Sequence, residues 1–270
     1  GAVFQGVPDI SARWNVALFI AMASGIGRAP LKTSIISMMD VESTPNAHRA
    51  VGALTSWARR FLNADVRLQS LPQAFRLWTD GLENPVIEEF GAGTEALHLA
   101  STARPELLRD AEYRSRFRRQ WSNRFKGRAY HRDLGEATVV SCPEHGYEGL
   151  TFQQIATVRG TDPVDAFLDL QAEYGNDLRW STTVGNRHED SVAWIVAHPQ
   201  AQIGFSDAGA HLRNMAFYNF PLHLLRLVQR RELDGRPIMS IGHAVHRVTG
   251  ELADYLDIDA GHLRVGDRAD

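Results

Sequence analysis

Short apolar runs alternate with longer segments of helical periodicity along the first quarter of the chain. The pattern predicts strands at 1–7, 31–39 and 66–71, and helices at 10–24 and 46–62. Strands that alternate with helices in this way favour an α/β fold whose strands are parallel.

The middle of the chain, 88–128, is predicted to be helical and is rich in arginine. Aromatic residues recur at every fourth position, at Tyr113, Phe117, Trp121 and Phe125. Acidic residues are interleaved with them, so this stripe indicates core packing rather than a stacking platform for nucleic acid.

Further strands are expected at 137–141 and 201–205, and further helices at 151–159, 163–174, 221–231 and 240–256. We expect the five strands to be parallel neighbours in an incomplete barrel, because strand-helix alternation favours parallel crossovers. No internal repeat or low-complexity linker is found, which predicts a single domain with a small appendage.

Bulk composition excludes several classes of protein. A hydrophobic fraction of 44% supports a packed core, and a formal net charge of -3 supplies no basic field for nucleic acid. The apolar runs fall far short of the roughly 20 residues that cross a bilayer, so no membrane partner is expected. A single cysteine, Cys142, excludes an internal disulfide and fits a cytoplasmic location. Because the chain opens inside one strand pattern and stops within another, we expect a fragment of a longer protein.

The stretch Gly204-Phe-Ser-Asp-Ala-Gly-Ala-His211 places a carboxylate and an imidazole just past a buried strand. Catalytic groups of α/β barrels lie at such strand ends. The small residues after Asp207 allow a sharp bend, which would let His211 turn back toward it. An aspartate that caps a turn is the structural alternative.

Other motifs are weaker. Residues 204–208 approach the nucleophile elbow of serine hydrolases, with Ser206 as nucleophile, but the last glycine is absent and no helix pattern follows. Residues 91–96 resemble a dinucleotide fingerprint that lacks an apolar strand before it. His243 and His246 have metal-ligand spacing on a helix, where surface histidines are commoner. Cys142, Glu144 and His145 form a secondary polar candidate.

The second half of the chain resembles the amidohydrolase superfamily, in particular D-aminoacylases and N-acyl-D-amino-acid deacylases. The matching segments occur in order and include Glu148-Gly-Leu-Thr-Phe152, Gly160-Thr-Asp-Pro163, His198-Pro199, Ser206-Asp-Ala-Gly-Ala-His211 and Gly261-His-Leu-Arg-Val-Gly266. The first half is only loosely similar.

This resemblance implies the C-terminal portion of a TIM-like (β/α)8 barrel over 1–259, and the start of a small β-sandwich over 260–270. It implies a metal-dependent hydrolase of non-peptide C–N bonds that acts on small N-acyl-amino-acid substrates. Zn²⁺ would activate a water whose proton Asp207 handles, with Asp207 also a metal ligand and the other ligands upstream of Gly1. His211 would be catalytic, and Ser206, His145 and Asn186 would contact substrate.

The family's histidines after the fifth and sixth strands are absent, and Ser37 and Gln69 stand in their places. His48 lies on a predicted helix, and Lys32 stands at the wrong end of its strand for a bridging ligand. A catalytically degenerate barrel that binds an acylated molecule therefore stays an alternative to the hydrolase, as does a serine hydrolase that uses Ser206.

Overall fold

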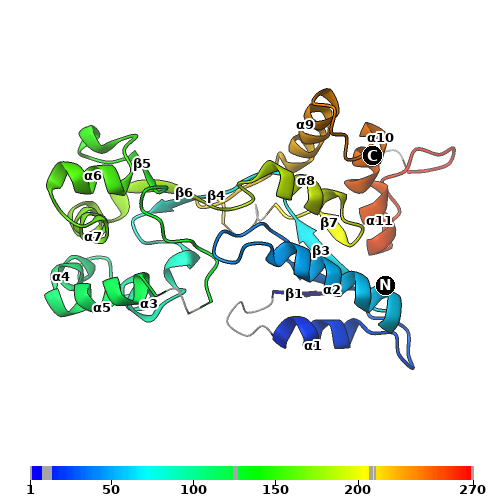
Figure 1. The fold of residues 1–270 in the computed structure, drawn as a ribbon, viewed down its shortest axis with the longest axis horizontal. Coiled ribbons are helices and arrows are strands. Elements are labelled where there is room, and N and C mark those ends of the chain that lie inside the picture. The colour runs from blue at the N-terminus through cyan, green and yellow to red at the C-terminus, as the bar shows by residue number, and fades with distance from the viewer. Residues whose placement is uncertain (1, 8–13, 124–126, 207–208, 210, 269–270) are drawn as a thin grey trace. The chain divides into compact units, whose positions relative to one another are not determined.

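A four-stranded parallel sheet organises one part of the protein (Figure 1). Its strands lie in the order β1 (Phe4–Gly6), β2 (Thr33–Ile36), β3 (Val66–Ser70) and β7 (Ala201–Ile203), and each neighbouring pair is parallel. Helices α1 (Trp14–Ala23), α2 (Ala47–Leu62) and α8 (Glu189–Ala197) belong to the same part. The computed structural model describes residues 2–7, 14–123, 127–206, 209 and 211–268.

The contacts group the chain into two compact units. Unit 1 comprises Gly1–Phe75, Gly185–Ala208 and Phe217–Asp270, and unit 2 comprises Arg76–Val184 and Gly209–Ala216. The sequence predicted one domain through residue 259, and the boundary at residue 260 stays a prediction.

The core of unit 1 fills the space between the sheet and its helices. Ile35 and Leu68, which are paired in register, pack with Ile20 of α1, Ala58 of α2 and Ile195 of α8. The alternation of side chains along a strand turns the intervening residues to the opposite face of the sheet. One face of the sheet is therefore apolar and covered by helices.

The close approach of α2 to α8 depends on a glycine. A Cβ atom at Gly52 would lie 2.9 Å from His198 Nε2, from Met38 Cε and from the Trp194 ring. Because all three neighbours are packed side chains, residue 52 has no room for a larger side chain.

A second core in unit 1 lies around α9 (Phe220–Leu233) and α10 (Ile241–Arg247), which precede α11 (Gly250–Leu256). Leu224 and Leu227 of α9 pack with Ile203 of β7 and Ala244 of α10. The helix predicted at 240–256 is thus two helices, interrupted just before Gly250.

Unit 2 has its own three-stranded sheet, in the order β4 (Phe75–Asp80), β6 (Arg179–Gly185) and β5 (Thr138–Ser141). Its helical elements are η1 (Pro85–Ile87), α3 (Gly91–His98), α4 (Arg104–Arg109), α5 (Ala111–Trp121), η2 (His145–Tyr147), α6 (Phe152–Arg159), α7 (Pro163–Tyr174) and η3 (Gly175–Asp177). The predicted aromatic stripe on α5 is confirmed as core, since Tyr113, Phe117 and Trp121 are buried. Phe125 lies outside the described residues.

The expectation that all five predicted strands are parallel neighbours is wrong for one of them. β5 pairs antiparallel with β6, with Thr138 opposite Ser181, and lies in the separate sheet of unit 2. The alternation rule placed every strand in one sheet, whereas the sequence between β3 and α8 forms a unit of its own. Closure of the parallel sheet into a barrel and a β-sandwich at 260–270 stay predictions.

Two of the weaker motifs lack the structural context that their proposed functions require. Residues 91–96 form α3, preceded by the 3-10 helix η1 rather than by a strand, so the dinucleotide fingerprint is a chance match. The first helix after Ser206 in the described chain begins at Phe220, which does not fit a nucleophile elbow. Among the described residues, no helix is both long and apolar enough to cross a membrane.

Candidate functional site

The carboxyl ends of the parallel strands in unit 1 are the place where an α/β fold collects its functional groups. A polar network lies on the sheet face opposite the helices. The Ser34 hydroxyl donates to Gln202 Oε1 at 2.9 Å, and Gln69 Nε2 donates to the Ser34 hydroxyl at 2.9 Å. Gln69, which stands where a metal-binding histidine was expected, therefore belongs to a hydrogen-bonded polar layer across β2, β3 and β7.

The central candidate of the sequence, Asp207, lies outside the described residues. Its neighbour Ser206 is half-buried, and the Ser206 carbonyl accepts a hydrogen bond from Phe217 N at 2.9 Å. The preceding Phe205 stacks on Phe75 with ring centroids 5.9 Å apart. The backbone that leads to Asp207 is thus anchored in unit 1, and the role of Asp207 stays a prediction.

His211 begins a short turn. Its carbonyl accepts hydrogen bonds from Asn214 N at 2.9 Å and from Met215 N at 2.7 Å, and its side chain is half-buried. The expected approach of its imidazole to Asp207 stays a prediction.

Asn186, a predicted substrate contact, is 2% exposed and adopts a left-handed backbone with φ 56°. Its Oδ1 accepts from Asp40 N at 2.9 Å, and its own N–H donates to Asp40 O at 2.7 Å. Its Nδ2 donates to Leu71 O at 2.9 Å. Asn186 therefore joins the segments that follow β2 and β3, and contact with a substrate stays a prediction.

The hydrogen bonds between Asn186 and Asp40 hold in place a cluster of side chains that the sequence analysis did not predict. His188 Nδ1 lies 2.8 Å from Asp40 Oδ2, and His48 Nδ1 lies 3.5 Å from Asp40 Oδ1. The side chains are 65% exposed for His188, 10% for Asp40 and 1% for His48. A nearly buried carboxylate thus stands between one exposed and one buried imidazole, just past the carboxyl end of β2.

The two imidazoles differ in electrostatic environment. Burial lowers the pKa of His48, and the Asp40 carboxylate opposes that effect. An ionised carboxylate only accepts hydrogen bonds, so its contact with His188 assigns the proton to Nδ1 and leaves Nε2 for an external partner. At this end of the unit 1 sheet, His188 therefore presents an exposed imidazole that the Asp40 carboxylate orients.

The secondary candidates gather in unit 2. His145 Nδ1 lies 3.0 Å from Glu148 Oε1, which also accepts from Cys142 N at 3.3 Å. The His145 side chain is 85% exposed, whereas Cys142 is buried, and burial raises the pKa of its thiol. Cys142 therefore resembles a small core residue, and a substrate role for His145 stays a prediction.

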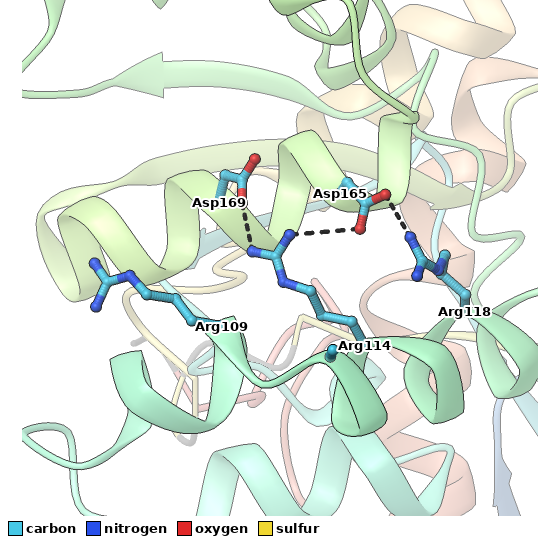
Figure 2. Close-up of a pocket in the computed structure, with 6 residues that line it drawn as sticks. Arg109, Arg114, Arg118, Asp165 and Asp169 are labelled. Atoms are coloured by element: carbon cyan, nitrogen blue, oxygen red, sulfur yellow. Dashed lines mark hydrogen bonds and ion pairs between the residues drawn. The ribbon is translucent and has the colours of Figure 1, made fainter.

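A hollow of about 500 Å³ in unit 2 is lined by charged residues of α4, α5 and α7 (Figure 2). Arg114 and Arg118 extend from α5 toward Asp165 and Asp169 of α7, and form ion pairs with them. Arg109 instead donates to Ala172 O at 3.1 Å. Because each carboxylate is already paired with a guanidinium, we interpret this network as a link between α5 and α7.

The described residues do not fit a metal centre. They include no group of three or more His, Cys, Asp or Glu side chains that could hold a metal ion. In the cluster around Asp40, the carboxylate separates the two imidazoles, so the three side chains do not converge on one point. His243 and His246 are exposed on α10, and no third ligand accompanies them in the described chain.

No protein-family model matches the chain. Two curated relatives are 43% identical over 275 residues: the uncharacterized proteins Rv2913c of Mycobacterium tuberculosis (strain H37Rv) and Mb2937c of Mycobacterium bovis. The match covers 100% of this chain and 45% of each relative, so the chain spans less than half the length of these proteins.

Solved structures with the same fold are named as enzymes. A D-aminoacylase that defines a subset of amidohydrolases matches with a TM-score of 0.56 and 17% identity, over 100% of this chain and 45% of that one. An N-acyl-D-glutamate deacylase from Bordetella bronchiseptica, complexed with zinc and a phosphonate mimic of the tetrahedral intermediate, matches with a TM-score of 0.55 and 19% identity, over 98% and 43%. The chain has the fold of the corresponding part of the D-aminoacylases, which confirms the predicted resemblance at the level of fold.

Proposed function

We propose that this chain is part of a hydrolase that cleaves amide C–N bonds, with N-acyl-amino acids as the substrate class. The observation that carries the proposal is the match of essentially the whole chain to the fold of D-aminoacylases and an N-acyl-D-glutamate deacylase. The cluster around Asp40 agrees with it, because the exposed His188 imidazole lies beside Asp40 just past the carboxyl end of β2, where this fold class binds ligands. A small-molecule substrate and a cytoplasmic location belong to the same proposal.

Asp207 is the proposed proton carrier. It follows β7 in a motif whose preceding residues, Phe205 and Ser206, are held in unit 1. A carboxylate there accepts a proton from the attacking water and later delivers it to the departing nitrogen, so that the amide becomes a carboxylic acid and an amine. His211 orients Asp207 in this proposal.

Metal dependence is also part of the proposal, since the solved relatives include a zinc complex and a D-aminoacylase with a binuclear metal centre. The residues described in this chain do not supply such a centre. The proposed ligands are Asp207 and residues upstream of Gly1. Elemental analysis of the full-length protein, followed by chelation and readdition of zinc, tests this part separately.

The first test replaces Asp207 in the full-length protein. Asp207→Asn keeps the shape of the side chain and removes the basic oxygen, so we expect kcat on N-acyl-D-amino acids to fall by at least about 100-fold. Circular dichroism and the melting temperature are expected to stay unchanged. His211→Ala is expected to lower kcat less, because it acts through Asp207.

Three outcomes would contradict the proposal. Near-normal kcat together with a lower melting temperature in Asp207→Asn would make the residue structural. Saturable binding of N-acyl-amino acids without turnover by the intact protein would indicate a degenerate enzyme. Covalent labelling of Ser206 by a fluorophosphonate would indicate a serine hydrolase.

A further inference from the structure

A basic hollow lies at the opposite ends of the unit 1 strands from the cluster around Asp40. It measures about 400 Å³ and is lined by Arg59, Arg67, Ala197, Pro199, Gln200, His243, Arg247 and Glu251. Arg67 is the second residue of β3, and β7 begins at Ala201, so the hollow adjoins the amino ends of these strands. Its volume is within the range of small-ligand sites.

Positive charge in this hollow exceeds negative charge. The lining includes three arginines, Arg59, Arg67 and Arg247, and one carboxylate, Glu251. Arginine stays protonated in proteins, so one glutamate leaves two positive charges without a counter-charge in the lining. His243 adds a further side chain that can donate a hydrogen bond.

Two of the arginines are fixed by the fold. Arg247 is 5% exposed, and its guanidinium donates to Glu251 and to three backbone carbonyls, the nearest being Ala201 O at 2.8 Å. Arg67 donates to Pro199 O at 3.0 Å and lies 3.6 Å from Glu251 Oε1. Burial lowers the pKa of Arg247, Glu251 opposes this, and Arg67 adds to it through like-charge repulsion. The hollow thus holds a pre-organised, crowded pair of guanidinium groups.

Arg59 differs from this pair. It lies in the last turn of α2 and is exposed, and its side chain makes no hydrogen bond or ion pair with another residue in the part of the chain that the structure describes. Its guanidinium is therefore available to a ligand, beside groups that are already oriented. A planar guanidinium donates two parallel hydrogen bonds to an oxyanion, and phosphate oxygens match this geometry.

We propose that this hollow binds a phosphate group, carried by a small metabolite or as inorganic phosphate. The ligand supplies the negative charge that Glu251 alone does not, with Arg59 as its principal donor and Arg67 and His243 beside it. Since α2, β3 and α10 all contribute to the lining, a bound phosphate links three elements of unit 1 and stabilises the folded state. The lining includes none of the proposed catalytic residues, so this inference does not depend on the proposed hydrolysis.

The test uses inorganic phosphate and pyrophosphate with the intact protein. We expect a saturable rise in the melting temperature and saturable broadening of the ³¹P signal, whereas sodium chloride at matched ionic strength gives neither. Arg59→Gln removes one charge-assisted donor pair from an exposed position and is expected to weaken phosphate binding by about tenfold or more.

Arg49→Gln is the matched control. Arg49 lies on the same helix, but its guanidinium is 5.0 Å from the Trp194 ring and does not line the hollow, so the variant should bind phosphate as the wild type does. Equal effects of chloride and phosphate, equal binding by Arg59→Gln and wild type, or loss of binding in Arg49→Gln would each overturn the assignment.

Discussion

At the scale of single residues, the backbone geometry around residue 186 explains why asparagine occupies this loop position. Its side chain accepts a hydrogen bond from the Asp40 N–H and donates one to the Leu71 carbonyl. Its backbone is left-handed, a conformation that asparagine tolerates better than most residues. This arrangement holds Asp40 where its carboxylate meets His188. Asn186, which the sequence suggested as a substrate contact, therefore stabilises the segments that follow β2 and β3.

We predict that Asn186→Ala lowers the free energy of unfolding by roughly 3 kcal/mol, because two buried backbone groups lose their partners and alanine is strained at φ 56°. Asn186→Gly also removes both side-chain hydrogen bonds but tolerates the left-handed backbone, so it should lose less. Urea unfolding of both variants measures the difference. Unchanged stability with a raised KM in the full-length protein would instead support a substrate contact.

Sequence analysis located the Asp207 motif but not the cluster around Asp40, and the reason is physical. Asp207 and its small neighbours are contiguous, so their pattern is visible in the chain itself. His188 and Asp40 are 148 positions apart, and residues 76–184 of unit 2 lie between them in the sequence. No local periodicity carries that information.

At the scale of elements, strands with clear apolar alternation or runs were predictable and the others were not. β3 alternates buried and half-buried residues and was predicted, whereas β6 buries Trp180, Ser181 and Thr182 in succession and has no period of two. β4 does alternate, with Phe75, Leu77 and Thr79 buried, but no element was predicted between 71 and 88. Helix α8 was also not predicted.

The start of α6 depends on a capping box. Thr151 Oγ1 accepts from Gln154 N at 3.2 Å, and Gln154 Oε1 accepts from Thr151 N at 2.8 Å. We predict that Thr151→Ala costs about 1 kcal/mol of stability, measured by urea unfolding. Thr157→Ala is the control, since the Thr157 hydroxyl only donates to Gln153 O within the same helix, and it should change stability by less than about 0.5 kcal/mol. Equal losses in the two variants would show that the cap contributes nothing.

At the scale of the whole molecule, the chain is a parallel α/β sheet with a separate unit inserted between β3 and α8. Strand-helix alternation predicted the four parallel strands of unit 1, since each is followed by a segment of helical pattern. It could not predict the insertion, because the local sequences of β5 and β6 do not indicate that these strands pair antiparallel in a second sheet. The fold class was therefore predictable from local patterns, and the division into units required long-range pairing.

Two histidines with lowered pKa values, the buried His48 and the half-buried His198, make the stability of the whole molecule depend on pH. His48 and His198 both contact the Trp194 ring, with ring centroids 5.5 Å and 5.1 Å from it. Burial lowers the pKa of both, opposed by Asp40 at His48 and reinforced by Arg247 at His198. Both are therefore neutral in the folded state at neutral pH.

The sign of the pH dependence follows from these lowered pKa values. Below pH of about 6.5 the unfolded chain binds protons at these two histidines more readily than the folded chain does, so the free energy of unfolding falls as pH falls. We predict a loss of up to about 1.4 kcal/mol per pH unit for each histidine between pH 6.5 and its folded pKa, and no contribution above that range. Urea unfolding at pH 7.5, 6.5 and 5.5 measures the slope. His48→Asn and His198→Asn should each reduce it, whatever their effect on stability at pH 7.5. A slope unchanged by both substitutions would place the acid sensitivity of the protein elsewhere.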